Sequence, residues 1–250
     1  MYMHIPVIDW LPVLGGPLVA AGLFIAALAR GAGKAGLPKS HSTAAIAAFT
    51  GFVVVWFVAY AFFAARGTFS FSSATRFPVL PIALLIPALA VVIAFRTVPA
   101  LRAMAENIPH ERLIGIQVVR LMGFAFLLLL AQSLLPAVFA LPAGLGDMFV
   151  GFEAIVVAGL YARNAPSAPM MGLIWNLTGI ADFALALAIG FLASTTPLQL
   201  IHVLPNTDLV AVLPLALVPT FGVPLFLVLH VLSLRRVIRE LKSTVRAVPA

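Results

Sequence analysis

The chain contains no cysteine and very little charge. Only 9% of its 250 residues are Asp, Glu, Lys or Arg, against roughly 25% in a soluble domain. The missing cysteines exclude disulfides, thiolate metal sites and cysteine nucleophiles. A hydrophobic fraction of 63% and a mean hydropathy of +1.14 indicate an integral membrane protein. The apolar segments run from end to end and leave no room for a separate soluble domain.

Seven of these segments are long enough to cross a bilayer, which takes about 20 residues. We expect spans at 11–29, 44–65, 78–95, 113–135, 142–162, 170–193 and 209–234. The predicted fold is therefore all-α, a polytopic membrane bundle of seven transmembrane helices that forms a single domain over residues 1–250. The opening stretch, MYMHIPVIDW, lacks the basic region of a cleaved signal peptide, so the first segment is expected to be retained.

The net charge of +7 is distributed unevenly along the loops. Twelve of the fifteen Lys and Arg residues fall on one side of the predicted membrane, two fall on the other, and Arg120 lies inside a span. By the positive-inside rule the N-terminus is outside and the C-terminus cytoplasmic. The basic excess thus reflects topology and not nucleic-acid binding. The basic tail, 235–250, is predicted to contact anionic lipids of the inner leaflet.

Two pairs of similar segments hint at an internal repeat. The stretch LPVLGGPLVAAG at 11–22 resembles LPAGLGDMFVGF at 141–152, and VLPIAL at 79–84 resembles VLPLAL at 212–217. The nearly equal offsets would relate the first three spans to the last three across the fourth. This 3+1+3 arrangement is a parallel repeat of the kind that transporters use. The alternative is chance similarity in a chain dominated by Leu, Val, Ala and Pro.

Two acids interrupt the apolar run GLGDMFVGFEAIVVAG at 144–159. Asp147 and Glu153 are six residues apart, so they project about 120° apart on a helix and cannot form a dyad on one face. Glu153 is predicted near the midplane and Asp147 in the outer third. An ionisable residue in a membrane span is a candidate functional residue by default. The alternative for each acid is a structural hydrogen bond between helices.

The sixth span carries a third acid at a depth similar to that of Asp147. Trp175, Gly179 and Asp182 share one helix face, with Asn176 about 120° away from Asp182. Small Gly179 would allow close helix approach. We expect Asp147 and Asp182 to form an outer pair that could hold a single proton or a cation.

The remaining polar residues of the spans are predicted to form an inner set. It consists of Glu153, Arg120, Asn176 and His230. Glu153 is the expected partner of Arg120; the alternative is that Arg120 extends to the membrane surface. His230 lies below three prolines that should loosen the seventh helix and free carbonyls: Pro214, Pro219 and Pro224. A packing role for His230 is the alternative to a functional one.

Several cofactor classes lack their usual ligands. The only lysines, Lys34, Lys39 and Lys242, lie outside the spans, so no retinal Schiff base is expected. Haem is disfavoured because His230 is the only histidine in a span. The weak candidates for a metal site are Asp147, Asp182 and His230. The identity of any bound cofactor is not defined by the sequence.

The segments LPAGLGD, WNLTGIAD and PTFGVPLFLVLH resemble a family of small bacterial seven-helix membrane proteins without a characterised activity. The similarity extends over residues 113 to about 234. It implies a multi-pass protein of the bacterial cytoplasmic (inner) membrane and transfers no function.

The leading interpretation is a transporter or channel-like protein for a small solute or ion that uses intramembrane carboxylates, and the sequence favours a non-enzyme without deciding the point. The proline-rich third and seventh spans would supply the flexing elements. A ligand- or cofactor-binding membrane sensor or electron-transfer protein is the second hypothesis. A membrane-embedded enzyme with an Asp/His site is the third. The expected partners are the lipid bilayer and the solute, with no nucleic acid; substrate, transport direction and oligomeric state are not specified by the sequence.

Overall fold

The computed structural model of the protein describes residues 5, 7–71 and 79–246, and this part is helical with no strand. Seven of its helices are long and apolar enough to cross a membrane. They run over Ile8–Lys34, Lys39–Ala65, Val79–Thr97, His110–Ala131, Ala137–Ala162, Ala168–Leu192 and Val218–Ser243. The prediction of an all-α bundle of seven spanning helices is confirmed.

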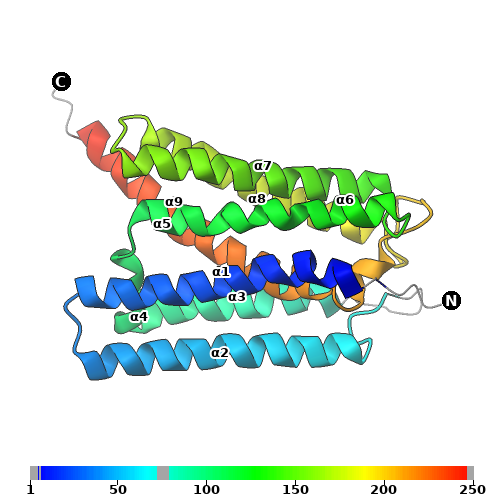
Figure 1. The fold of residues 1–250 in the computed structure, drawn as a ribbon, viewed down its shortest axis with the longest axis horizontal. Helices are drawn as coiled ribbons and strands as arrows, with labels where there is room; N and C mark the ends of the chain where they lie inside the picture. The colour runs from blue at the N-terminus through cyan, green and yellow to red at the C-terminus, as the bar shows by residue number, and fades with distance from the viewer. Residues whose placement is uncertain (1–4, 6, 72–78, 247–250) are drawn as a thin grey trace.

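The long helices lie side by side along the long axis of the molecule (Figure 1). They are α1 (Val7–Lys34), α2 (Lys39–Ala65), α3 (Val79–Thr97), the fourth span, α7 (Ala137–Ala162), α8 (Ala168–Leu192) and α9 (Val223–Arg246). A short helix, α4 (Pro99–Glu106), lies at the end of the bundle where α9 finishes, which we name the α4 end. Helix α1 starts at the opposite end, which we name the loop end, as an odd number of spans requires (Figure 1).

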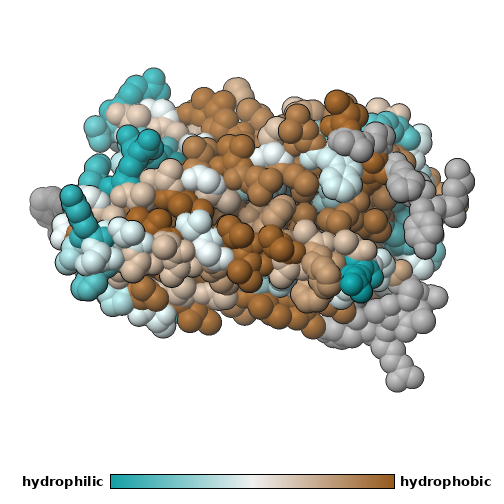
Figure 2. Space-filling model, turned by 60° about the horizontal axis from the view of Figure 1, so that its bottom comes forward, coloured by the Kyte–Doolittle hydropathy of each residue, from teal (hydrophilic) through white to brown (hydrophobic). Residues whose placement is uncertain are grey.

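The surface is organised as that of a protein in a bilayer. Hydrophobic side chains form a belt around the middle of the face shown in Figure 2, and hydrophilic residues gather at the two ends. Large apolar side chains such as Val55, Leu89 and Phe152 are more than half exposed. Burial of such groups against lipid is favourable, so the belt marks contact with the bilayer. The N-outside orientation and the 3+1+3 repeat stay predictions.

The seventh span differs from its expected bounds of 209–234. A long connection precedes it and contains the short 3-10 helix η2 (Asp208–Ala211). The spanning helix begins only with the π turn η3 (Val218–Gly222), because Pro214 lies before it and cannot extend a helix. The basic residues from Arg235 onward continue α9 without a break to Arg246.

The fourth span changes its winding midway along its length. It consists of α5 (His110–Gly115), the 3-10 helix η1 (Ile116–Gly123) and α6 (Phe124–Ala131). A 3-10 helix has about three residues per turn, so side chains three apart share a face. Gln117, Arg120 and Gly123 form such a row, and all three are buried. The change of winding therefore aligns the buried Arg120 with a glycine one turn away.

The π turn frees one carbonyl, as the prolines of the seventh span predict. Pro224 has no N–H to donate to the carbonyl of Thr220, four residues earlier. The indole Nε1 of Trp56 donates to that carbonyl instead, at 2.9 Å. Both groups are buried, so this hydrogen bond joins α2 to the start of α9 and satisfies a carbonyl that would otherwise be orphaned in an apolar environment.

Replacing Trp56 by phenylalanine should therefore destabilise the protein. The ring is retained, but the Thr220 carbonyl loses its donor, which costs about 1–3 kcal/mol. We expect a lower unfolding temperature in detergent micelles for Trp56→Phe. The matched control is Trp10→Phe at a position that is 36% exposed, where we expect little change. Equal effects of the two substitutions would contradict the bonding role of Trp56.

Candidate functional site

A buried guanidinium organises the polar residues of the bundle. The side chain of Arg120 is 0% exposed. Its Nε donates to Asp147 Oδ1 at 2.8 Å, and its Nη2 donates to Asp182 Oδ2 at 2.5 Å. Its Nη1 lies 3.1 Å from Nε2 of His230, and its carbon Cζ lies 4.0 Å from the ring centre of Phe183. We name these five residues the Arg120 cluster.

Helix α7 reaches this cluster because glycines let it approach the fourth span. A Cβ added to Gly123 would overlap the Cβ of Asp147, so the glycine makes room for the acid. A Cβ on Gly151 would come within 2.8 Å of the backbone nitrogen of Leu121. Small residues allow such close backbone contact in membrane bundles. The run GLGDMFVG of α7 is therefore a packing surface that presents Asp147 to Arg120.

Two further glycines leave space for side chains of the cluster. A Cβ on Gly146 would overlap the carboxylate of Asp182, and a Cβ on Gly179 would overlap the imidazole of His230. The expectation that Gly179 permits close helix approach is confirmed, and its neighbour is α9. These glycines fix where Asp182 and His230 can lie.

The structure brings Asp147 and Asp182 together on one guanidinium, while their role in binding stays a prediction. The predicted Arg120–Glu153 contact is wrong: Arg120 binds the other two acids, and Oε2 of Glu153 is buried without a hydrogen-bond partner among the described residues. The physical reason is the height of Arg120 along the fourth span. The fourth span starts at His110, earlier than expected, and its 3-10 stretch rises about 2.0 Å per residue instead of 1.5. Arg120 is thereby lifted towards the outer acids.

A chain of polar contacts continues from the cluster towards the α4 end. Nδ1 of His230 lies 3.0 Å from Oδ1 of Asn176, and Nδ2 of Asn176 donates to Oγ of Ser233 at 3.0 Å. Ser233 Oγ lies 3.1 Å from Nε2 of His110. Nδ1 of His110 lies 3.3 Å from Oε1 of Glu240, without the alignment of a hydrogen bond. We name these five residues the polar chain.

Donor and acceptor roles along the polar chain follow from its first member. A guanidinium can only donate, so Nε2 of His230 must accept from Arg120. The proton of His230 is then on Nδ1, where it is donated to Asn176. The Asn176 amide donates in turn to Ser233, whose hydroxyl shares a hydrogen bond with Nε2 of His110 in a direction set by the tautomer of that imidazole. The donors from Arg120 to Asn176 therefore point towards the α4 end.

Aromatic side chains hold the two histidines. Trp175 packs against His230 with ring centres 4.6 Å apart, and its indole donates to the carbonyl of Val150 at 3.0 Å. Tyr161 packs on His110 at 4.1 Å, and its hydroxyl donates to Glu240 at 3.0 Å. Trp175 thus supports the imidazole and binds α8 to α7, and its indole N–H faces the Val150 carbonyl and not the cluster.

Sequence reasoning missed five residues of this network: Phe183, Ser233, His110, Tyr161 and Glu240. A signal existed for two of them. His230, Ser233 and Glu240 are three and seven residues apart, which places them on one face of a helix. No such signal links His110 to Ser233, because they belong to different helices 123 positions apart.

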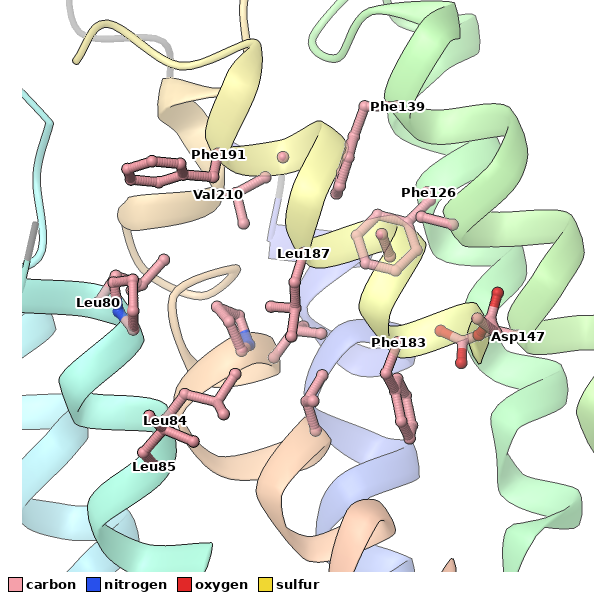
Figure 3. Close-up of a pocket in the computed structure, with 18 of the residues that line it drawn as sticks. Leu80, Leu84, Leu85, Phe126, Phe139, Asp147, Phe183, Leu187, Phe191 and Val210 are labelled. Carbon is pink, nitrogen blue, oxygen red and sulfur yellow. The ribbon is translucent and has the colours of Figure 1, made fainter. Parts of the chain in front are cut away.

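The carboxylates of the cluster face a cavity of about 270 Å³. Its walls come from α3, α6, α7, α8 and the segment around η2 and η3. Figure 3 shows Phe126, Phe139, Leu187 and Phe191 around this space, with Asp147 at one side of it. Among the described residues that line the cavity, Asp147 and Asp182 are the only ones with polar side chains.

The arrangement does not fit a metal centre built from Asp147, Asp182 and His230. All three contact the same guanidinium, which supplies the positive charge at the place where a metal ion would bind. Within residues 5, 7–71 and 79–246, no group of three His, Cys, Asp or Glu side chains is placed to hold a metal ion.

The order Ser233–His110–Glu240 resembles that of a nucleophile, its base and an orienting acid. The nucleophile of such a site must be reachable by a substrate. Ser233 is 1% exposed, and its oxygen is already hydrogen bonded to Asn176 and His110. Ser233 is not among the residues that line the cavity beside the Arg120 cluster. The contacts support a structural role in joining α8, α9 and α5.

The model of the domain of unknown function DUF8737 matches residues 77–238. The matched region contains the whole Arg120 cluster and begins earlier than the resemblance in the sequence suggests, so that it includes the third span. No curated protein and no solved structure matches the chain.

Removing the guanidinium should destabilise the fold because it leaves two buried carboxylates without a counterion. We expect Arg120→Met to reduce the free energy of unfolding by about 3–5 kcal/mol, measured in detergent micelles. In an Asp147→Asn, Asp182→Asn background the same substitution should cost much less, since no charge is then left uncompensated. Glu153→Gln is the control on α7 and should be near neutral. An equal loss in both backgrounds would contradict the electrostatic role of Arg120.

Proposed function

We propose that this chain, which belongs to the family of the domain of unknown function DUF8737, carries a small solute or ion across the membrane and binds its charged part with Asp147 and Asp182. The observation that carries the proposal is the charge of the cluster. Two carboxylates and one guanidinium leave one net negative charge inside an apolar bundle. A charge that is buried without compensation costs several kcal/mol, so a mobile proton or cation is the natural counterion.

The cavity on one side of the cluster and the polar chain on the other favour passage over simple binding. On the side of the loop end, the carboxylates face the cavity. On the side of the α4 end, the polar chain leads from His230 to Glu240, whose side chain is 41% exposed. Apolar residues would seal this path permanently, whereas hydroxyl, amide and imidazole groups can exchange their partners for water.

Two irregular helical segments next to the cluster supply elements that can move. The 3-10 helix η1 carries Arg120 itself. The π turn η3 contributes Val218 and Pro219 to the cavity wall. Departures from the α-helix of this kind often mark functional hinges. A rearrangement of either segment would change the cavity and the Arg120 contacts together.

The apolar lining of the cavity also fits the second hypothesis, a membrane protein that binds a ligand without moving it. The two functions differ in access. A transporter must expose its site to each side in turn, whereas a receptor needs only one opening. Transport therefore requires the polar chain to open towards the α4 end, whereas ligand binding without transport does not.

Single cysteines can test this directly, because the chain has none of its own. We expect Ala186→Cys in the cavity wall to react with a membrane-impermeant methanethiosulfonate reagent added on the side of the loop end. Ser233→Cys, in the polar chain, should react from the side of the α4 end. Vesicles of defined orientation keep the two sides apart.

The matched control is Leu129→Cys, which is as buried as Ser233 but belongs to the apolar core and not to the polar chain. It should stay unreactive from both sides. Ser233→Cys that remains as unreactive as Leu129→Cys, while Ala186→Cys is modified, would overturn transport and leave one-sided ligand binding.

A further inference from the structure

We infer that the cavity beside the Arg120 cluster binds a compact lipophilic cation, a molecule with an aromatic or aliphatic body and a protonated amine as its head. This cation would be the solute of the proposed transporter, and its binding by Asp147 and Asp182 rests on that proposed function. The class of ligand follows from the lining of the cavity and from its charge.

The walls select the body of the ligand. Five phenylalanines line the cavity, from different helices and loops: Phe71, Phe126, Phe139, Phe183 and Phe191. Such walls offer neither donors nor acceptors, and they favour an apolar group through the hydrophobic effect. Aromatic rings also attract a cation that lies over their faces. A hydrophilic solute such as a sugar would lose its hydrogen bonds to water here without replacement.

The polar end selects the head of the ligand. Asp147 and Asp182 each give one oxygen to Arg120. The other oxygen of each carboxylate has no hydrogen-bond partner among the described residues, and that of Asp182 lies against Gly146. Both acids line the cavity, whereas Arg120 is 0% exposed and does not. A ligand therefore meets the two acidic groups and not the positive charge behind them.

A protonated amine satisfies this end better than an inorganic cation or an anion. Its N–H groups can donate to carboxylate oxygens, and its charge balances the excess negative charge of the cluster. A metal ion would need several more oxygen ligands, which the phenylalanine walls lack. An anion would be repelled by the carboxylates.

One wall of the cavity adjoins the surface that faces the bilayer. Leu85 of α3 lines the cavity and is 52% exposed, within the apolar belt of the spanning helices. Lipophilic amines partition into membranes, so a site beside this belt is close to a raised local concentration of its ligand. The position of the cavity thus agrees with the class of ligand that the walls and the carboxylates select.

Three probes with the same body separate the contribution of the head. They are 4-phenylbutylamine, which is cationic at neutral pH, 4-phenylbutanol, which is neutral, and 4-phenylbutyrate, which is anionic. Binding is measured by titration calorimetry on the protein in nanodiscs of zwitterionic lipid, with protein-free nanodiscs as the reference for partitioning. We expect saturable binding of the amine, and binding of the alcohol and the acid at least about tenfold weaker.

Two variants connect this binding to the cavity. Asp182→Asn should weaken the amine about tenfold or more, because it removes the excess negative charge. Ala186→Phe fills the cavity without touching Arg120 and should abolish binding, which keeps the test valid if Asp182→Asn folds poorly. Glu153→Gln, outside the cavity, should bind as the wild type does. Equal affinity for amine and alcohol, or unchanged binding in Ala186→Phe, would overturn the inference.

The outcome is separable from that of the cysteine experiment. Amine binding without access from the α4 end would leave a receptor for lipophilic cations. Two-sided access without amine binding would leave a transporter of another solute and refute the ligand class.

Discussion

The rest of the structure depends on the contacts of the Arg120 guanidinium. Removing such a group from water costs several kcal/mol unless geometry and hydrogen bonds compensate. Here all three of its nitrogens have partners and Phe183 covers one face. These partners come from α7, α8 and α9, so one charge holds four spans together. Membrane helices gain no hydrophobic stabilisation from contact with one another in lipid, which gives such contacts particular weight.

The 3-10 stretch of the fourth span and the nearby glycines serve this contact. The 3-10 winding of η1 places Arg120 and Gly123 on one face, where Gly123 admits Asp147. Gly146 and Gly179 make space for Asp182 and His230. The cluster is therefore built from backbone features as much as from charged side chains, and substitutions at the glycines would displace the charged groups without altering any of them.

Much of the fold could be predicted from the sequence, because long apolar segments report directly on spanning helices. The site was harder to predict from the sequence. Helical spacing correctly separated Asp147 from Glu153 and placed Asp182 at a depth similar to that of Asp147. It failed for Arg120, since counting a fixed rise per residue assumes an α-helix, and η1 is not one. The contact of Ser233 with His110 joins distant parts of the chain and leaves no local pattern.

In the proposed cycle, the asymmetry of the cluster would link the ligand to the polar chain. A cation beside Asp147 and Asp182 would compete with Arg120 for both carboxylates. When these contacts weaken, His230 and Phe183 are the members of the cluster that still contact the guanidinium. His230 begins the polar chain, so a change in its bond to Arg120 would alter the hydrogen bonds that Asn176 makes to His230 and to Ser233. In the proposed cycle, occupation of the cavity would therefore loosen the seal on the other side, which is the coupling that alternating access requires.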